Sequence, residues 1–146
     1  MPESDTSRWA SRTSAAIVLV RILVGWVFAS EGMQKFLFPA QLGVGRFEKI
    51  GLPAPHVLAP LVGAVEIGCG TLVVVGLFTR WAAVPLLGVI SVAIATTKVP
   101  MLAKSGTWSM LHEARTDFSM VLGLVFLLIA GAGSISLDRL RRARAG

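Results

Sequence analysis

Four long apolar blocks run through the sequence, and their lengths limit the folds open to the chain. They are Ala15–Phe38, Val57–Phe78, Trp81–Thr97 and Asp117–Ala132, the last two at the short end for a bilayer span. A membrane-spanning helix needs about 20 mostly apolar residues, within a range of about 17–25. The chain is only 15% charged, whereas soluble domains are about a quarter charged. The sequence therefore predicts an all-α fold, an integral membrane four-helix bundle.

The expected organisation is a transmembrane domain at residues 15–138 between a polar tail at 1–14 and a basic tail at 139–146. Arg21 interrupts the first apolar block, so we interpret this block as a retained helix and not as a cleaved signal peptide. Four spans place the links 39–56 and 98–116 together on the side opposite to the termini. The arginine-rich run RLRRAR favours a cytoplasmic location for both termini, because cytoplasmic ends of membrane proteins are enriched in Lys and Arg.

Charge and cysteine content exclude several classes of protein. The net charge is +6, but the basic residues mark the ends of apolar blocks and form no aromatic-interleaved surface for nucleic acid. Cys69 is the single cysteine, which excludes an intramolecular disulfide, a CxxC pair and a Cys-rich metal site. His56 and His112 are expected at the outer surface and not at metal-ligand spacing. We therefore expect no metal site and no cofactor bound by a recognisable motif.

Glu66 is the single charged residue in the second apolar block, near the predicted bilayer midplane. A charge at the bilayer centre costs about 2.5–3.5 kcal/mol on insertion scales, so it normally faces a partner or water. Small residues such as Gly63 and Gly70 share the Glu66 face of the helix, which favours a close helix crossing. Arg21 and Lys35 lie along one face of the first block, with Glu31 at its edge. We therefore expect these polar groups to meet along one interior seam.

The candidate intramembrane site consists of Arg21, Glu31, Lys35 and Glu66, and its role has two interpretations. In the first, Glu66 is part of a structural clasp, either protonated and hydrogen-bonded or paired with Lys35 or Arg21. In the second, Glu31, Lys35 and Glu66 supply exchangeable protons to a quinone-like headgroup or a proton relay. Glu31 and Lys35 are also i,i+4 neighbours that can pair, and Arg21 can instead snorkel to the cytoplasmic headgroups.

Four further charged residues form a second group of candidates. Lys98 ends the third block on the same face as its small residues, and Arg80 lies in the tight connection after the second block. Glu113 and Asp117 are i,i+4 neighbours at the expected start of the fourth helix. Helix N-termini favour carboxylates, so we expect Glu113 and Asp117 to cap this helix.

An ordered set of short motifs resembles the DoxX family over roughly residues 15–140. The motifs are RILVGWVFASEGMQKFLFP, IGLPAP, LVGAVEIGCGTLVVVGLFTRWAA and GAGSISLD. The resemblance implies a small four-helix protein of bacterial plasma membranes. The family takes its name from the small subunit of a thiosulfate:quinone oxidoreductase, and its members are often linked with redox partners. By position, the recurrent polar and glycine residues of the family correspond to Arg21, Glu31, Gly32, Lys35, Glu66, Gly76 and Arg80.

The fold implied by the resemblance is also similar to that of four-helix quinone reductases, but their paired-cysteine chemistry is excluded by the single Cys69. We therefore expect an accessory or anchoring subunit of a membrane redox complex, not catalytic alone, with a quinone-facing polar seam as one form of this hypothesis. The alternative is a non-catalytic membrane scaffold or binding protein whose seam only fixes helix packing. A small transporter has less support, since no inverted repeat of broken helices is visible. The expected partners are the lipid bilayer and a redox protein, and a homo-oligomer stays open.

Overall fold

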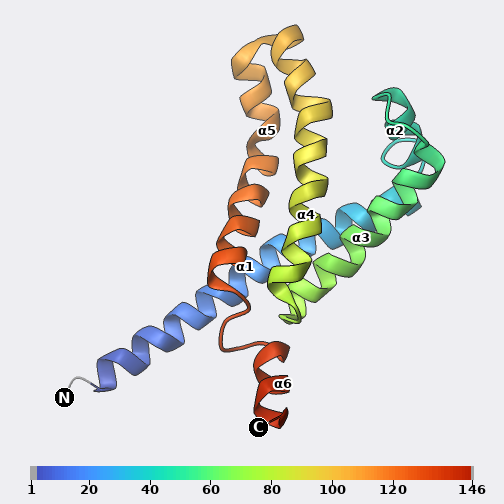
Figure 1. Cartoon of the computed structure of the whole chain (residues 1–146). Helices are drawn as coiled ribbons and strands as arrows, with labels where there is room; N and C mark the ends of the chain where they lie inside the picture. Colours follow the sequence, from blue (N-terminus) through green and yellow to red (C-terminus); the bar gives the residue numbers. More distant parts are fainter. Residues whose placement is uncertain (1–2, 146) are drawn as a thin grey trace.

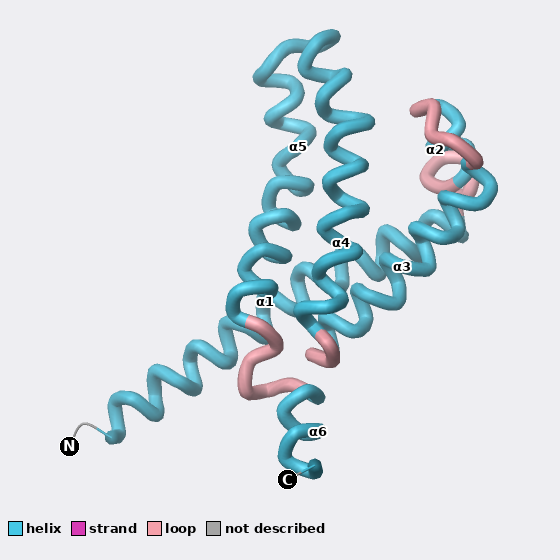
Figure 2. Tube along the Cα trace, viewed as in Figure 1, coloured by secondary structure: helices cyan, strands magenta, loops and turns pink. Residues whose placement is uncertain are grey.

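The computed structural model describes residues 3–145, apart from the side chains of 3–8, 10 and 145, and this part of the chain contains helices and no strand. The helices are α1 (Glu3–Leu37), α2 (Val44–Lys49), α3 (Pro55–Val75), α4 (Thr79–Ala93), a π-helical turn η1 (Ile94–Lys98), α5 (Val99–Ala130) and α6 (Leu137–Ala145). The all-α prediction is confirmed. Figure 1 shows their arrangement, and Figure 2 shows how little of the chain lies in loops.

Three helical stretches are long and apolar enough to cross a membrane, namely Ser11–Leu37, Pro55–Val75 and Thr79–Ala130. The third is a hairpin, because Gly106 takes a non-helical conformation with φ 80° and ψ 171°. In Figure 1 the chain rises through α4, reverses and descends through α5. With α1 and α3, the two halves of this stretch on either side of Gly106 give four long helical arms in the described part of the chain, which agrees with the prediction of a four-helix bundle. Both arms of the hairpin extend beyond the predicted limits of 81–97 and 117–132. Helix continues into the polar segment on either side of Gly106, since only this residue has to leave the helical region.

The two ends of the molecule differ in what they carry. The N- and C-termini lie at one end in Figure 1, here called the terminal end, while α2 and the Gly106 turn lie at the other. This arrangement agrees with the prediction that the two longer links share the side opposite to the termini. The structure therefore separates a basic end, which contains α6, from an end formed by the α1–α3 connection and the tip of the hairpin.

Helices α1 and α3 cross antiparallel at very short range. A Cβ atom added to Gly25 would lie 2.5 Å from the carbonyl oxygen of Gly70, and one added to Gly32 would lie 2.6 Å from that of Gly63. A step of seven residues along α1 is thus matched by a step of seven back along α3. Small residues allow helix backbones to approach in this way in membranes. The structure confirms the close crossing predicted from the glycines.

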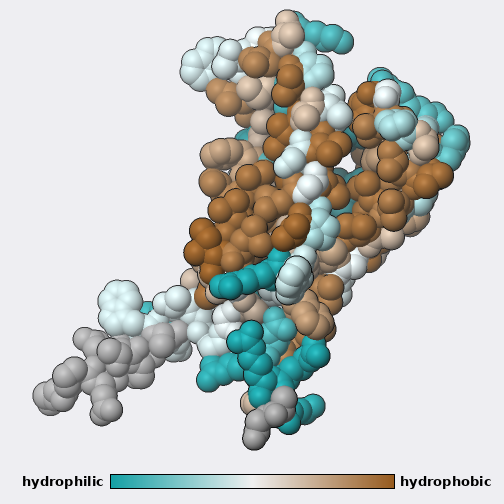
Figure 3. Space-filling view, in the orientation of Figure 1, coloured by the Kyte–Doolittle hydropathy of each residue, from teal (hydrophilic) through white to brown (hydrophobic). Residues whose placement is uncertain are grey.

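The apolar core lies near the terminal end, where all four arms meet. Its largest fully buried side chains include Leu86 of α4, Leu124 and Leu127 of α5, and Val24 of α1. No residue from 91 to 119 is buried, so the far half of the hairpin makes no core with α1 and α3. Figure 3 shows this half standing apart from the α2–α3 region, with hydrophobic residues on both sides of the gap. The bundle is therefore packed at the terminal end and open at the other.

Candidate functional site

Arg21 is buried at the terminal end of the bundle, with 3% of its surface exposed. Its Nε donates to the carbonyl of Val73 (3.0 Å) and its Nη2 to that of Val74 (2.6 Å), at the end of α3. Its Nη1 donates to Ala132 (2.9 Å) and Ile135 (2.6 Å) in the loop after α5. The last carbonyls of a helix lack partners within that helix, and Arg21 donates hydrogen bonds to two such carbonyls of α3. The guanidinium therefore joins α1, α3 and the α5–α6 loop, and the prediction that Arg21 snorkels to the headgroups is wrong.

Gly76 makes room for this guanidinium. It ends α3 with φ 71° and ψ 41° and donates to the Leu72 and Val73 carbonyls. A Cβ atom at this position would lie 2.5 Å from the Arg21 Cζ. Glycine adopts positive φ without steric cost, so Gly76 is needed both for the backbone turn and for the space beside Arg21. Arg21 and Gly76 therefore depend on each other in this chain, because any side chain at position 76 would occupy the place of the guanidinium.

Lys35 and Glu66 form an ion pair between α1 and α3, with 2.6 Å between Lys35 Nζ and Glu66 Oε2. Their side chains are 12% and 5% exposed. Lys35 Nζ also lies 3.5 Å from the backbone carbonyl oxygen of Glu31, whose side chain is exposed. The i,i+4 spacing had suggested that Lys35 could pair with Glu31. Within residues 3–145, the carboxylate that pairs with Lys35 is instead that of Glu66. The charge inside the membrane has a partner on the neighbouring helix, as its burial requires.

The predicted seam residues fall into two centres. Arg21 and Lys35 are fourteen residues apart on α1, which corresponds to about 21 Å of helix at a rise of 1.5 Å per residue. Arg21 contacts the C-terminal end of α3, whereas Lys35 contacts Glu66 in its middle. The side-chain pattern correctly indicated a shared helix face, but distance along that face prevents Arg21 and Glu66 from acting together.

Lys98 and Asp117 form a third contact, with 3.4 Å between Lys98 Nζ and Asp117 Oδ2. It joins η1 to α5 across the hairpin. The capping prediction for Glu113 and Asp117 is wrong, because helix already resumes after Gly106 and both residues lie inside α5. Asp117 is a cross-hairpin partner, and the side chain of Glu113 is exposed.

Arg80 and Asp138 organise the terminal end of α4. Arg80 Nη2 donates to the carbonyl of Ile129 at 2.8 Å, which ties α4 to α5. The Asp138 carboxylate accepts the backbone N–H of Phe78 at 3.1 Å, and the Asp138 N–H donates to Gly76 at 3.1 Å. Phe78 precedes α4 in a left-handed conformation with φ 50°, which these contacts hold in place. Asp138 was not among the residues predicted from the sequence, although the motif GAGSISLD contains it.

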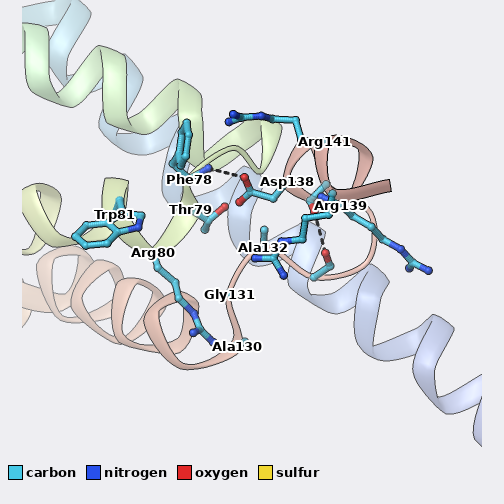
Figure 4. A pocket seen from close by; sticks show the side chains of 13 residues that line it. Phe78, Thr79, Arg80, Trp81, Ala130, Gly131, Ala132, Asp138, Arg139 and Arg141 are labelled. Atoms are coloured by element: carbon cyan, nitrogen blue, oxygen red, sulfur yellow. Dashed lines mark hydrogen bonds between the residues drawn. The ribbon is translucent and has the colours of Figure 1, made fainter. Parts of the chain in front are cut away.

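A cavity of about 800 Å³ lies beside these residues, between the start of α4, the α5–α6 loop and α6. Figure 4 shows its lining, which includes four arginines and one aspartate. The cavity also lies outside the predicted site. Three of its arginines belong to the basic run of the C-terminal segment. In the sequence this run indicated only the orientation of the protein in the membrane.

Histidines and the cysteine are separate from these centres. His56 Nε2 lies 3.3 Å from the carboxylate of Glu48 in an exposed pair, and His112 is exposed on α5. Cys69 is half-buried on α3 beside the core. No group of three or more His, Cys, Asp or Glu side chains with metal-binding geometry occurs in the part of the chain that the structure describes.

Comparison with known proteins places the chain in a family. The DoxX family model matches residues 16–99, more than half of the chain. A Mycobacterium tuberculosis protein described as an uncharacterized membrane protein is 54% identical over 136 residues, which cover 89% of this chain and 83% of the relative. No solved structure matches the chain significantly. With its apolar membrane-length helices and this extended similarity, the chain belongs to the DoxX family of small membrane proteins.

Proposed function

We propose that this DoxX protein is an accessory or anchoring subunit of a membrane redox complex, in which a partner carries out the electron transfer. The observation that carries this proposal is that the ionisable groups within the membrane spans are engaged in hydrogen bonds and an ion pair between helices. Arg21 donates four hydrogen bonds to backbone carbonyls, and Glu66 is paired with Lys35 at 2.6 Å. Groups engaged in this way hold helices together, which suits a subunit that binds and positions a partner.

The far half of the α4–α5 hairpin is the surface that we assign to this partner. No residue from 91 to 119 is buried, and the exposed apolar side chains there include Val92, Val99, Trp108, Leu111 and Phe118. Without a strong hydrophobic force between helices in lipid, close packing is what holds membrane helices together. A transmembrane helix of the partner, lying between the hairpin and the α1–α3 pair, would supply the packing that this half lacks.

The orientation in the membrane is part of the same proposal. We place the protein in the bacterial plasma membrane with both termini in the cytoplasm. Arginines 139, 141, 142 and 144 of α6 all lie beside the terminal end of the spans, and cytoplasmic ends carry such an excess of basic residues. In this orientation the open half of the hairpin lies on the side of the membrane opposite to the cytoplasm.

Native purification tests the proposal. The full-length tagged chain is purified in mild detergent from its own membranes, together with the double variant Leu111→Ala/Phe118→Ala and the control Leu19→Ala/Leu23→Ala on the exposed face of α1. We expect a redox protein at fixed stoichiometry with the wild type and the control, and its loss from the hairpin variant. Recovery of the chain alone, or only with further copies of itself, would refute the partner.

The Lys35–Glu66 contact itself favours a second candidate, a scaffold whose polar seam only fixes helix packing. The two side chains are 12% and 5% exposed, so a quinone headgroup reaches the carboxylate only if the pair opens. Glu66→Gln distinguishes the roles. Lower quinone reduction by the membranes, with the partner still bound, supports a quinone-facing seam. Unchanged activity with a less stable bundle supports the scaffold.

A further inference from the structure

The cavity at the terminal end is strongly basic. The described residues that line it include Arg80, Arg139, Arg141 and Arg142, and among them Asp138 is the single acidic residue. The Asp138 carboxylate accepts the Phe78 N–H at the start of α4, so it is engaged in ordering this turn. Four guanidinium groups around one carboxylate leave a net positive charge in the cavity, which suits an anionic ligand.

The arginines retain donors for such a ligand. A guanidinium group carries five N–H donors, and Arg80 uses one of them for the Ile129 carbonyl. Arg141 lies over the Phe78 ring, 4.9 Å from its centroid, as Figure 4 shows. Stacking on a ring occupies the face of the guanidinium and leaves its edge N–H groups available. Arginine binds phosphate through two parallel N–H donors, and its planar fork matches this geometry.

Thr79 adds a second, independent observation. It lines the cavity with 1% of its surface exposed, and its Oγ1 has no hydrogen-bond partner within residues 3–145. Figure 4 shows the Thr79 side chain directed toward Asp138, on the side of the cavity. Buried hydroxyl groups are normally satisfied. An oxygen-rich ligand in the cavity would give this hydroxyl an acceptor.

The surroundings of the cavity are amphipathic. On the side of the membrane spans, Trp81 is 77% exposed and Ile129 is 74% exposed, while α6 presents arginines on the other side. Figure 3 shows the hydrophobic surface of the hairpin meeting the hydrophilic surface of the terminal end at this point. Tryptophan favours the headgroup level of a bilayer. A phospholipid has this same layout, with acyl chains beside apolar helices and a charged phosphate beyond them.

We propose that this cavity binds the phosphate group of an anionic phospholipid, with Arg80, Arg141 and Arg142 as the contacting residues and Trp81 beside the acyl chains. Basic pockets at the ends of transmembrane helices bind anionic headgroups through the same chemistry. The proposal is independent of the redox partner, since it rests on residues at the opposite end from the open half of the hairpin.

The test is lipid binding by the delipidated full-length protein in neutral detergent, with phosphatidylglycerol as the probe and native mass spectrometry as the readout. Arg141→Gln/Arg142→Gln removes two charges from the cavity. We expect its apparent affinity for phosphatidylglycerol to fall about 30-fold, because each arginine near an anionic surface contributes about fivefold. Both residues are exposed on α6, so the variant is expected to keep the helix content and unfolding temperature of the wild type.

The matched control is Lys104→Gln/Arg115→Gln, which removes two exposed charges near the hairpin tip. These charges lie beyond the Debye length from the cavity, so we expect wild-type binding. Phosphatidylcholine has the same phosphate but no net charge, so it should bind the wild type more weakly and lose less affinity than phosphatidylglycerol in the cavity variant. An equal loss in both double variants, or none in either, overturns the proposal. Inorganic phosphate alone, if it saturates the cavity as readily as the lipid does, overturns the assignment of a lipid as the ligand.

Discussion

Replacement of Arg21 by Met tests the most connected side chain of the bundle. Arg21→Met keeps an unbranched apolar stem of similar reach but removes all four hydrogen bonds to the carbonyls of α3 and the α5–α6 loop. Arg21 is 3% exposed, so its apolar stem and that of Met are both buried, and the main loss is that of the guanidinium. The variant therefore isolates the contribution of this group to holding three segments together.

The size of the effect follows from two bounds. Hydrogen bonds to charged groups contribute about 1.5–3 kcal/mol each in soluble proteins, so four of them would give about 6–12 kcal/mol, and about 12 kcal/mol is the upper bound. Interhelical hydrogen bonds within membranes average about 0.6 kcal/mol, which gives a lower bound of about 2.4 kcal/mol. We expect Arg21→Met to lower the free energy of unfolding by about 2.4–6 kcal/mol, between the membrane value and the lower end of the value for soluble proteins.

The assay is reversible unfolding in mixed micelles with a rising mole fraction of denaturing detergent, followed by circular dichroism. Arg12→Met on the same helix is the control, because Arg12 is exposed and an exposed substitution changes stability by about 0.5 kcal/mol or less. Arg21→Lys keeps the charge without the planar fork and should fall between the two. If the free energies of unfolding of Arg21→Met and Arg12→Met differ by less than about 0.5 kcal/mol, the four hydrogen bonds of Arg21 do not stabilise the bundle.

Three further perturbations use the same unfolding assay. Gly32→Ala should destabilise by about 1–3 kcal/mol, because its Cβ would lie 2.6 Å from a facing carbonyl, whereas Gly68→Ala, with open space around it, should stabilise by about 0.5–1 kcal/mol; equal effects would contradict the close crossing. Lys35→Met should cost about 3–5 kcal/mol by leaving the Glu66 carboxylate buried alone, and Lys35→Met/Glu66→Leu should recover most of this loss; additive losses would exclude a direct pair. Gly106→Ala should cost about 1–3 kcal/mol through its backbone conformation of φ 80° and ψ 171° alone, since no atom lies near the added Cβ; a neutral result would mean that the hairpin turns elsewhere.

The two charge centres give the protein different mechanical roles along its length. The hydrogen bonds of Arg21 join α1, α3 and the α5–α6 loop at the terminal end, where the apolar core and the basic cavity lie. The Lys35–Glu66 pair holds α1 to α3 farther from the terminal end, and the α4–α5 hairpin has no buried residue in its far half, from 91 to 119. A partner that enters between the two helix pairs could therefore do so without disturbing the terminal end.

The sequence by itself determined the membrane-spanning helices, the close α1–α3 crossing and the burial of Glu66. Each depends on local information, namely the length of an apolar block, the spacing of glycines at helical periodicity, and the cost of a lone charge in lipid. The reversal of the chain at Gly106 was harder to predict from the sequence, because the polar residues around Gly106 permit both a loop and a longer helix.

Only the tertiary structure decided which groups meet. Arg21 has the reach to snorkel or to turn inward, and the positions of the α3 end and the α5–α6 loop select the inward direction. Lys35 has two carboxylates within helical reach, and the crossing register presents Glu66 rather than Glu31. The basic cavity also required three segments distant in the chain to come together. Such choices depend on the relative placement of helices, which the periodicity of one helix does not contain.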